Sequence, residues 1–206
     1  MNLANRITLA RIFLVPVIMF FLLVRLDLPK ITFADFTITY NQIIATLIFI
    51  LAASTDGLDG YIARKNKIVT NLGKLLDPLA DKLLIAAVLI SLVDMGKLDA
   101  WIAIVIISRE FAVTGLRQIA LLDGRVMAAS KWGKWKTAIQ ITAIIALLLN
   151  NFPFTFIGVP FDIISSWLAA VITIYSGIDY FVKNKQVIHL PRKKDDKNNG
   201  SEESKA

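Results

Sequence analysis

Six long apolar segments, separated by short polar turns, limit what this chain can fold into. Hydropathy and the Pro and Gly breakers place them at about 7–24, 41–63, 74–93, 99–121, 135–151 and 160–182. Each is close to the roughly 20 residues that an α-helix needs to cross a bilayer. Because 56% of the 206 residues are hydrophobic and only 19% are charged, a soluble domain of this size could not bury the apolar surface. The sequence therefore predicts an all-α integral membrane protein with six transmembrane helices.

The basic residues predict how these helices are oriented. Only three of the 23 Lys and Arg residues fall on one side of the predicted bundle, namely Arg25, Lys30 and Lys97. The others lie at the opposite helix ends, in the connections at 64–74 and 122–136, or in the termini. Since cytoplasmic segments carry the excess of Lys and Arg, both termini are expected in the cytoplasm. The same excess explains the net charge of +7, so membrane lipid is the expected partner and nucleic acid is not.

Two segments are too polar to lie inside a membrane. Residues 28–40 are expected to form either an outer-face loop or a short interfacial helix, and the sequence does not decide between them. Residues 183–206 are expected to form a polar, disordered cytoplasmic tail, which leaves residues 1–182 as the six-helix domain. The chain has no cysteine, and its single histidine, His189, lies in the tail. Thiolate and histidine chemistry within the bundle are thereby excluded.

Four aspartates cluster where the second predicted span ends and the third begins. Two antiparallel helices joined by a short hinge would turn two acidic faces toward each other. The face of the first helix, at offsets of 0, 3, 4 and 7, consists of Asp56, Asp59, Gly60 and Ala63. The face of the second helix, at offsets of 0, 4 and 8, consists of Gly73, Asp77 and Asp81.

Such a concentration of carboxylates predicts a metal site at the membrane boundary. A charge near the hydrocarbon costs at least about 2.5 kcal/mol, and mutual repulsion raises carboxylate pKa values. Hard divalent cations relieve both effects, and oxygen ligands suit Mg²⁺, Mn²⁺ or Ca²⁺. Two metals that share carboxylates form a clamp for phosphoryl transfer. The small residues beside the acids let a ligand approach the backbone, and Arg64 is placed to meet a phosphate.

Two other interpretations of the aspartates remain open from the residues alone. The acids can pair with neighbouring basic residues and serve helix packing, or they can mark the cation pathway of a channel or transporter. Four acids on two matching faces exceed what helix packing requires. The metal pocket is therefore the favoured interpretation.

The spacing of these residues resembles the signature of the CDP-alcohol phosphatidyltransferase family. The full pattern D-x₂-D-G-x₂-A-R-x₈-G-x₃-D-x₃-D is present as Asp56, Asp59, Gly60, Ala63, Arg64, Gly73, Asp77 and Asp81. The resemblance implies a dimeric, six-helix membrane enzyme that moves a phosphatidyl group from CDP-diacylglycerol to an alcohol and releases CMP. It also implies a polar active-site cavity on the cytoplasmic side of the cell membrane, here a bacterial plasma membrane.

The same resemblance assigns roles to individual residues. Two divalent cations, Mg²⁺ or Mn²⁺, are implied, with Asp56, Asp59, Asp77 and Asp81 as ligands. Asp81 is also the implied general base. The opening NLANRIT resembles the family's Asn-x-Pro-Asn-x-x-Thr, with Ala4 in place of the proline. The residues implied to bind CDP-diacylglycerol are Asn5, Thr8, Asp56, Gly60, Ala63 and Arg64.

Basic residues in the fourth and fifth spans indicate the acceptor. Arg109 and Arg117 are eight residues apart and face broadly one way, and Lys134 follows at the entrance to the fifth span. Basic groups inside a span need an anion, and a phosphate suits Arg and Lys ligands. Lys131 and Lys136 are also explained by snorkelling to the membrane surface. The blocks REF-x₄-LR and GK-x-KT resemble family members that use glycerol 3-phosphate, which implies Arg109, Arg117 and Lys134 as ligands of its phosphate.

Several alternatives to this acceptor and this class of protein remain. Within the family, phosphatidylglycerol, serine or an inositol phosphate could replace glycerol 3-phosphate, although two arginines disfavour an uncharged acceptor. Outside it, a cation channel or transporter, or a membrane scaffold without catalysis, would use the aspartates differently. With glycerol 3-phosphate, the implied products are phosphatidylglycerophosphate and CMP, a step of phosphatidylglycerol biosynthesis.

Overall fold

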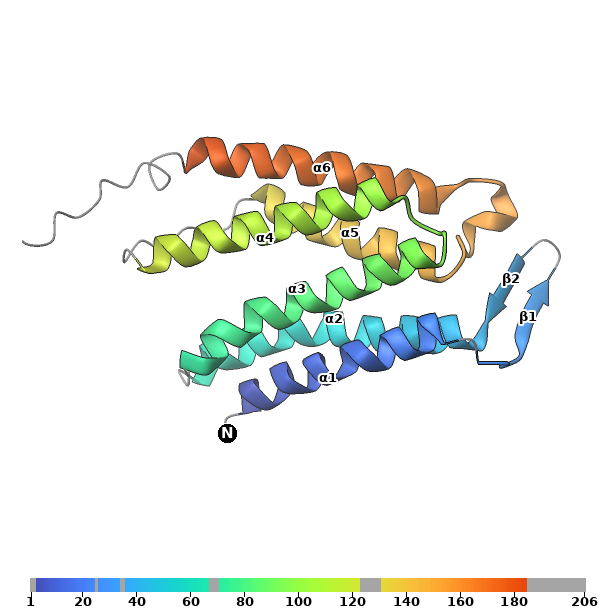
Figure 1. Ribbon diagram of the computed structural model, residues 1–206, viewed down its shortest axis with the longest axis horizontal. Helices are drawn as coiled ribbons and strands as arrows, with labels where there is room; N and C mark the ends of the chain where they lie inside the picture. Colours follow the sequence, from blue (N-terminus) through green and yellow to red (C-terminus); the bar gives the residue numbers. More distant parts are fainter. Residues whose placement is uncertain (1–2, 25, 34–35, 67–70, 123–130, 185–206) are drawn as a thin grey trace, which may run out of the picture.

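The computed structural model consists of six long helices and one short hairpin (Figure 1). In chain order the elements are α1 Leu3–Leu23, β1 Lys30–Phe33, β2 Phe36–Thr39, α2 Tyr40–Asn66, α3 Asn71–Asp94, α4 Ala100–Leu122, α5 Lys131–Leu148, the 3₁₀ helix η1 Phe154–Ile157 and α6 Phe161–Lys183. The structure describes residues 3–24, 26–33, 36–66, 71–122 and 131–184. Within these ranges the side chains left outside the description are those of 3–7, 56–66, 71–78, 81, 121–122, 131–132 and 134.

Each predicted apolar segment coincides with one helix, so the prediction of six long helices is confirmed, although the described residues also include two short strands that an all-α fold would lack. The ends differ by a few residues; α5, for example, ends at Leu148 where the apolar segment was expected to reach 151. Asn150 and Asn151 follow with φ angles of 53° and 64°. Asparagine adopts this left-handed conformation more readily than most residues, and it stops the helix there.

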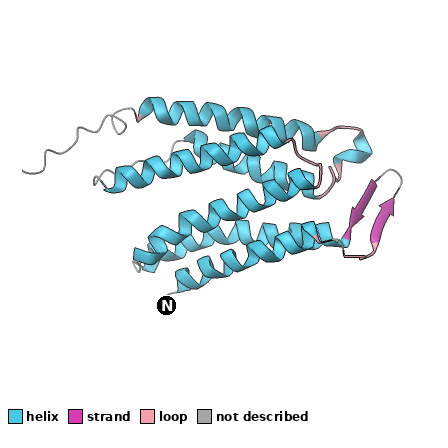
Figure 2. Ribbon diagram, viewed as in Figure 1, coloured by secondary structure: helices cyan, strands magenta, loops and turns pink. Residues whose placement is uncertain are grey.

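The six helices form two groups of three that lie side by side (Figures 1 and 2). In one group α1 packs against both α2 and α3, and in the other α6 packs against both α4 and α5. The groups are joined where α3 meets α4 and α5 and where α2 meets α5. The larger of two apolar clusters runs through this junction, and its most deeply buried members include Ile18, Phe49, Leu84, Val88, Leu92, Ile106, Ile144 and Leu148.

The two ends of the bundle differ in what they carry. At one end lie the start of α1, the end of α2 and the start of α3, the end of α4 and the end of α6 (Figure 1). At the other end lie the hairpin, η1 and the α3–α4 connection (Figure 1). The aspartate-bearing ends of α2 and α3 therefore belong to the end at which the helical chain begins and finishes.

Segment 28–40 is a β-hairpin, so both conformations expected for it, a loop and a helix, are wrong. Strands β1 and β2 pair antiparallel, with Lys30 opposite Thr39 and Phe33 opposite Phe36. The sequence FTIT alternates in burial, because Phe36 and Ile38 are buried while Thr37 is exposed. That period of two is the pattern of a half-buried strand. Phe33 and Phe36 lie against Phe156 of η1, each with ring centroids 6.0 Å apart.

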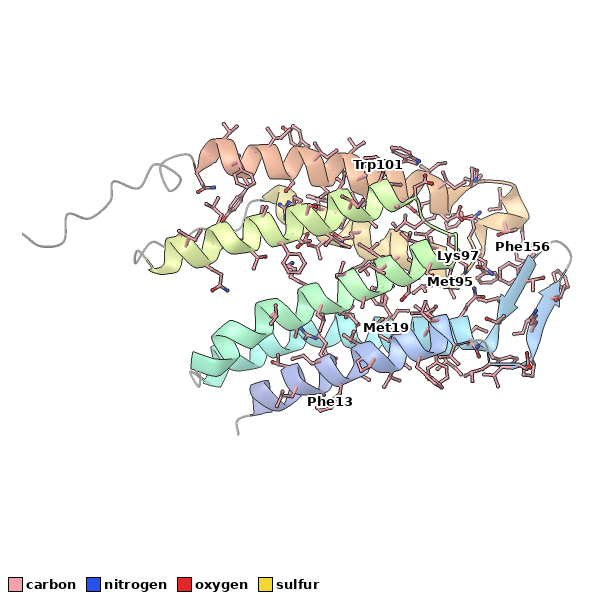
Figure 3. The ribbon with its side chains drawn as sticks, viewed as in Figure 1. Phe13, Met19, Met95, Lys97, Trp101 and Phe156 are labelled. Carbon is pink, nitrogen blue, oxygen red and sulfur yellow. The ribbon has the colours of Figure 1, made fainter. Side chains whose placement is uncertain are left out.

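Large apolar side chains cover much of the outside of the bundle. Phe13 is 72% exposed and Trp101 is 76% exposed, at opposite helix groups (Figure 3). Within the described residues, α6 is the one helix both long and apolar enough to cross a membrane. Shorter apolar stretches occupy Thr8–Leu23, Tyr40–Thr55 and Trp135–Leu148.

Candidate active site

The acidic signature lies on two consecutive helices, as its spacing predicts. Helix α2 continues without a break to Asn66 and so includes Asp56 and Asp59, while α3 begins at Asn71 and includes Asp77 and Asp81. Only residues 67–70 separate the two helices, which places both acidic segments at the same end of the bundle. The side chains of the four aspartates, and of Gly60, Ala63, Arg64 and Gly73, lie outside the described residues.

Helix α1 brings a buried polar strip to this end. Val15, Ile18 and Leu22 form its buried stripe, and the same three-and-four spacing continues to Arg11 and Thr8. Thr8 and Arg11 are each only 2% exposed. Both belong to the buried side of α1, which packs against α2 and α3, the helices that carry the aspartates. Thr8 is thus buried at the predicted end of the bundle, and the side chain of Asn5 lies outside the description.

A buried carboxylate joins three helices on the other side of α3. Glu110 of α4 is 5% exposed and forms ion pairs with Lys82 of α3 and Lys136 of α5. Lys82 contacts Oε2 of the carboxylate and Lys136 contacts Oε1. The Nη1 atom of Arg109 lies 3.6 Å from the same Oε1. Three cations therefore surround one acid at the junction of α3, α4 and α5.

The two predicted acceptor arginines both reach α6. Arg109 donates from Nη2 to the Ser176 hydroxyl at 2.8 Å, and Arg117 donates from Nε to the Tyr180 hydroxyl at 3.1 Å. Their partners are one helical turn apart, so the arginines lie on one side of α4, as their spacing predicts. The buried Nε of Arg109 has no hydrogen-bond partner among the described residues. That N–H group is a donor available to an anion.

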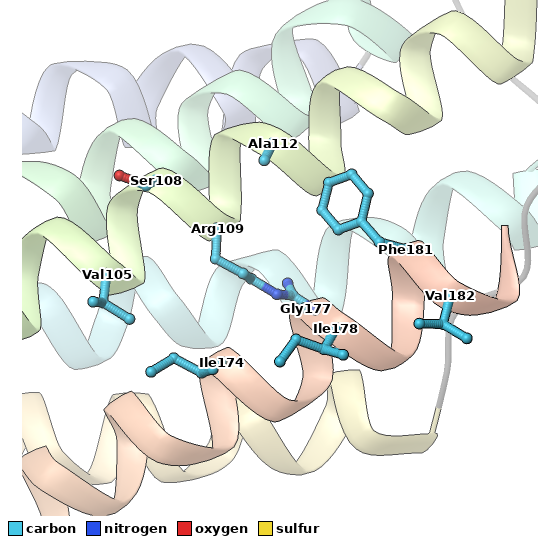
Figure 4. Close-up of a pocket in the computed structure, with 9 residues that line it drawn as sticks. All are labelled: Val105, Ser108, Arg109, Ala112, Ile174, Gly177, Ile178, Phe181 and Val182. Carbon is cyan, nitrogen blue, oxygen red and sulfur yellow. The ribbon is translucent and has the colours of Figure 1, made fainter. Parts of the chain in front are cut away.

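A close helix approach makes room for Arg109. A Cβ atom placed on Gly177 of α6 would lie 3.2 Å from Cγ of Arg109. Figure 4 shows the Arg109 side chain running from α4 toward Gly177, at the floor of an open groove of about 500 Å³ between α4 and α6. Apart from Ser108 and Arg109, the residues that line this groove are apolar or glycine.

Three lysines lie near the start of α5, and the side chain of the first, Lys131, is outside the described residues. Lys134, expected to bind the acceptor phosphate, has its side chain outside the described residues. Lys136 is only 3% exposed and is paired with Glu110, so the snorkelling interpretation is wrong for it. A buried ammonium needs an anionic partner, and helix α4 supplies one.

Sequence reasoning missed Arg11, Lys82, Glu110 and the partners on α6. A usable signal existed for Glu110, because it occupies a position in the buried stripe of α4 between Ile106 and Val113. A charged residue at a core position marks a functional or paired group. The partners Ser176 and Tyr180 carried no such signal, since only tertiary packing brings α6 to α4.

The donor set fits a hard divalent cation. Among the described side chains there is no group of three or more acidic, His or Cys residues that could hold a metal. The candidate ligands are instead the four aspartates at the ends of α2 and α3, which offer oxygen atoms alone. Oxygen-only ligation matches the preference of Mg²⁺ and Mn²⁺.

Known proteins are similar to this chain over most of its length. The sequence profile of CDP-alcohol phosphatidyltransferase matches residues 1–175. The CDP-diacylglycerol–glycerol-3-phosphate 3-phosphatidyltransferase of Bacillus subtilis (strain 168) is 49% identical over 187 residues, which cover 91% of this chain and 97% of that protein. Proteins of the same name from Haemophilus influenzae and Rickettsia bellii are 39% and 37% identical, each over 87% of this chain and over 91% and 93% of their own length. With a match of this extent and the complete acidic signature on α2 and α3, the chain belongs to the CDP-alcohol phosphatidyltransferase family.

Proposed function

We propose that this enzyme transfers the phosphatidyl group of CDP-diacylglycerol to glycerol 3-phosphate, giving phosphatidylglycerophosphate and CMP. The observation that carries the proposal is the pairing of the family signature on α2 and α3 with two arginines held on one side of α4. The relatives named for glycerol 3-phosphate, which match nearly their full length, support the same acceptor.

The acceptor phosphate binds the basic residues of α4 and α5 in this proposal. Arg109 and Arg117 supply guanidinium donors, and Lys134 supplies an ammonium group from the first turn of α5. The available Nε of Arg109 supports this role, because a buried guanidinium N–H gains most from a charged acceptor. Contacts with Ser176 and Tyr180 hold both arginines before the substrate arrives, which lowers the ordering cost of binding.

The chemical step is an attack of the acceptor hydroxyl on phosphorus. Asp81 accepts the proton of the sn-1 hydroxyl of glycerol 3-phosphate as a general base. The oxygen forms a bond to the β-phosphorus of CDP-diacylglycerol, the bridging P–O bond breaks, and CMP leaves with its electron pair. Asn5, Thr8, Gly60, Ala63 and Arg64 bind the departing nucleotide.

Divalent cations complete the site. Asp56, Asp59, Asp77 and Asp81 would hold two ions, Mg²⁺ or Mn²⁺, which neutralise the pyrophosphate when bound. The four aspartates belong to α2 and α3, so they would act in the part of the site that binds the nucleotide.

The enzyme works in a membrane in this proposal, as a homodimer with all six helices spanning a bacterial plasma membrane. The exposed apolar side chains on both helix groups support this placement, because lipid is the solvent in which they cost nothing. Both termini and the active site lie on the cytoplasmic side. The gathering of the aspartate helices and both ends of the helical chain at one end supports that orientation, together with the basic residues there. A lipid substrate and a soluble acceptor can meet at this boundary.

An acceptor panel tests the proposal. The purified protein is assayed for CMP release from CDP-diacylglycerol with glycerol 3-phosphate, phosphatidylglycerol, serine or an inositol phosphate, with and without Mg²⁺ or Mn²⁺. Release with glycerol 3-phosphate that requires the metal is the expected result. Release with another alcohol alone would replace the acceptor, and ion flux in liposomes without any CMP release would indicate a channel or transporter.

A further inference from the structure

Glu110 of α4 connects three helices through its ion pairs with α3 and α5. Its carboxylate receives Lys82 from α3 on one oxygen and Lys136 from α5 on the other. The proposed transfer reaction assigns no role to Glu110. Both lysines are close in sequence to residues with a proposed role in the reaction. Lys82 directly follows Asp81, and Lys136 lies two residues after Lys134.

Burying a carboxylate such as that of Glu110 lowers stability unless its ion pairs offset the loss of hydration. Removing a carboxylate from water costs several kcal/mol, and apolar side chains of similar volume often stabilise a protein at least as well as a buried ion pair. The stripe of α4 shows the apolar choice on both sides, at Ile106 and Val113. A purely structural explanation therefore leaves the charged residue at this one position unexplained.

The charges around Glu110 indicate what it organises. Its three described neighbours are cations, and the closest in sequence, Arg109, is a proposed phosphate ligand. A carboxylate would repel a phosphate placed against it directly. It can instead hold ammonium and guanidinium groups at fixed positions, since a buried ion pair restrains both partners.

We propose that Glu110 is a positioning residue for the acceptor: its carboxylate fixes the start of α5 through Lys136, and the adjoining part of α3 through Lys82, so that the basic residues of α4 and α5 meet the acceptor phosphate in one geometry. This role rests on the proposed function. It assigns Glu110 to the acceptor side of the site, with no contact of its own with either substrate.

If only the net charge near the acceptor phosphate mattered, removing the charge of Glu110 would have the opposite effect on acceptor binding. Replacing Glu110 by an uncharged residue raises the positive potential near the phosphate, which by itself strengthens anion binding. A positioning role has the reverse effect, because the cations that Glu110 restrains become free to separate from one another. The sign of the change in acceptor KM therefore distinguishes the two effects.

The experiment compares Glu110→Gln and Glu110→Asp with the wild type by CMP release, normalised to folded protein. Glu110→Gln is expected to raise KM for glycerol 3-phosphate by roughly 10- to 100-fold, the range for loss of an interaction with a charged group. KM for CDP-diacylglycerol should stay within about twofold of the wild type, because none of the residues that pair with Glu110 is a proposed nucleotide ligand. Glu110→Asp keeps the charge one carbon further back and is expected to recover part of the loss.

A partly buried lysine provides the matched control. Lys97 donates to Leu147 and Asn150 at the far end of the bundle, so Lys97→Gln also removes a partly buried cationic contact. It is expected to change thermal stability without changing either KM. If Glu110→Gln does not give folded protein, Glu110→Asp decides, and an unchanged acceptor KM in it overturns the proposal.

Three outcomes with folded variants also overturn it: an unchanged acceptor KM, a lowered acceptor KM, or equal changes in both KM values. The wild type separates this inference from the proposed function. No CMP release with glycerol 3-phosphate defeats the proposed function, and the KM comparison is then made with the alcohol that does support release. Wild-type activity with glycerol 3-phosphate and an unchanged KM in Glu110→Gln defeats the positioning role alone.

Discussion

Arg117 donates from Nε to the hydroxyl of Tyr180 at 3.1 Å, and its guanidinium carbon lies 5.3 Å from the centroid of the same ring. Tyr180 thus restrains this arginine in two ways, by a hydrogen bond and by the face of its ring. It is itself only 2% exposed and packs with Val113, Leu116 and Ala120 of α4. An arginine held this way is ready to receive an anion before the anion arrives.

Tyr180→Phe separates these two restraints. The ring and its packing remain, but the hydroxyl that accepts from Arg117 is lost. We expect KM for glycerol 3-phosphate to rise about 2- to 10-fold, which corresponds to one hydrogen bond, with little change in kcat. Tyr180→Leu removes the ring as well and should raise KM further and lower the unfolding temperature. Equal KM values for the wild type and Tyr180→Phe would show that the hydroxyl does not position Arg117.

Gly177→Ala tests the passage of Arg109 beside α6. The added Cβ would lie 3.2 Å from Cγ of Arg109, so that side chain must shift by a few tenths of an ångström. We expect KM for glycerol 3-phosphate to rise roughly two- to tenfold, because a displaced Arg109 would bind the acceptor phosphate less well, and small misplacements of a positioning residue are costly. CMP release at varied acceptor concentration measures the change.

Gly115→Ala is the matched control on α4. Nothing lies within 4 Å of a Cβ placed there, and the residue is likewise within a helix. Because the added methyl group meets no neighbour, Gly115→Ala should leave KM unchanged. Both substitutions gain helix propensity of up to about 1 kcal/mol, so Gly115→Ala should also slightly raise the unfolding temperature. A similar effect of both substitutions on KM would remove the role given to Gly177.

The helices could be predicted from the sequence because their apolar residues are continuous and long. The acidic segments were placed on α2 and α3 for the same reason, since their spacing is helical. Glu110 and Arg11 could have been predicted but were not. Each falls on the buried stripe of its helix, at a position that otherwise holds apolar residues. A charge in that register is a sequence signal for a buried polar site.

Other features needed the tertiary structure. Ser176 and Tyr180 are unremarkable residues in an apolar helix until α6 packs against α4. The hairpin at 30–39 was missed because its strands are only four residues long, too short for alternation to stand out from a polar loop. Its aromatic side chains pack against η1, which lies more than 100 residues away in the chain.

Lys97 should make stability depend on pH in the alkaline range. It lies between α3 and α4, where burial lowers the pKa of its ammonium group from 10.5 to about 8, although nearby Asp162 raises that pKa in part. Between these two pH values the unfolded chain binds more protons at this residue than the folded one does. Stability from this group therefore rises as pH increases from about 8 to 10.5.

Thermal unfolding of the detergent-solubilised protein across this range measures the effect. Lys97→Gln should remove the alkaline gain in unfolding temperature and leave the acceptor KM unchanged, because the residue lies at the hairpin end of the bundle (Figure 3). An unfolding temperature that falls equally in both proteins as pH rises would mean that Lys97 stays charged in the folded state.

Asp81→Asn tests the proposed base on α3. The amide keeps the size of the side chain but cannot accept the proton, so we expect kcat to fall by about 10²- to 10⁴-fold with much smaller changes in both KM values. Asp94→Asn, at the other end of the same helix, is the control and should retain wild-type activity. Asp56→Asn should instead weaken metal binding, so that activity returns in part at higher Mn²⁺ or Mg²⁺ concentration. If excess metal restores Asp81→Asn equally well, Asp81 acts as a ligand and the base is another group.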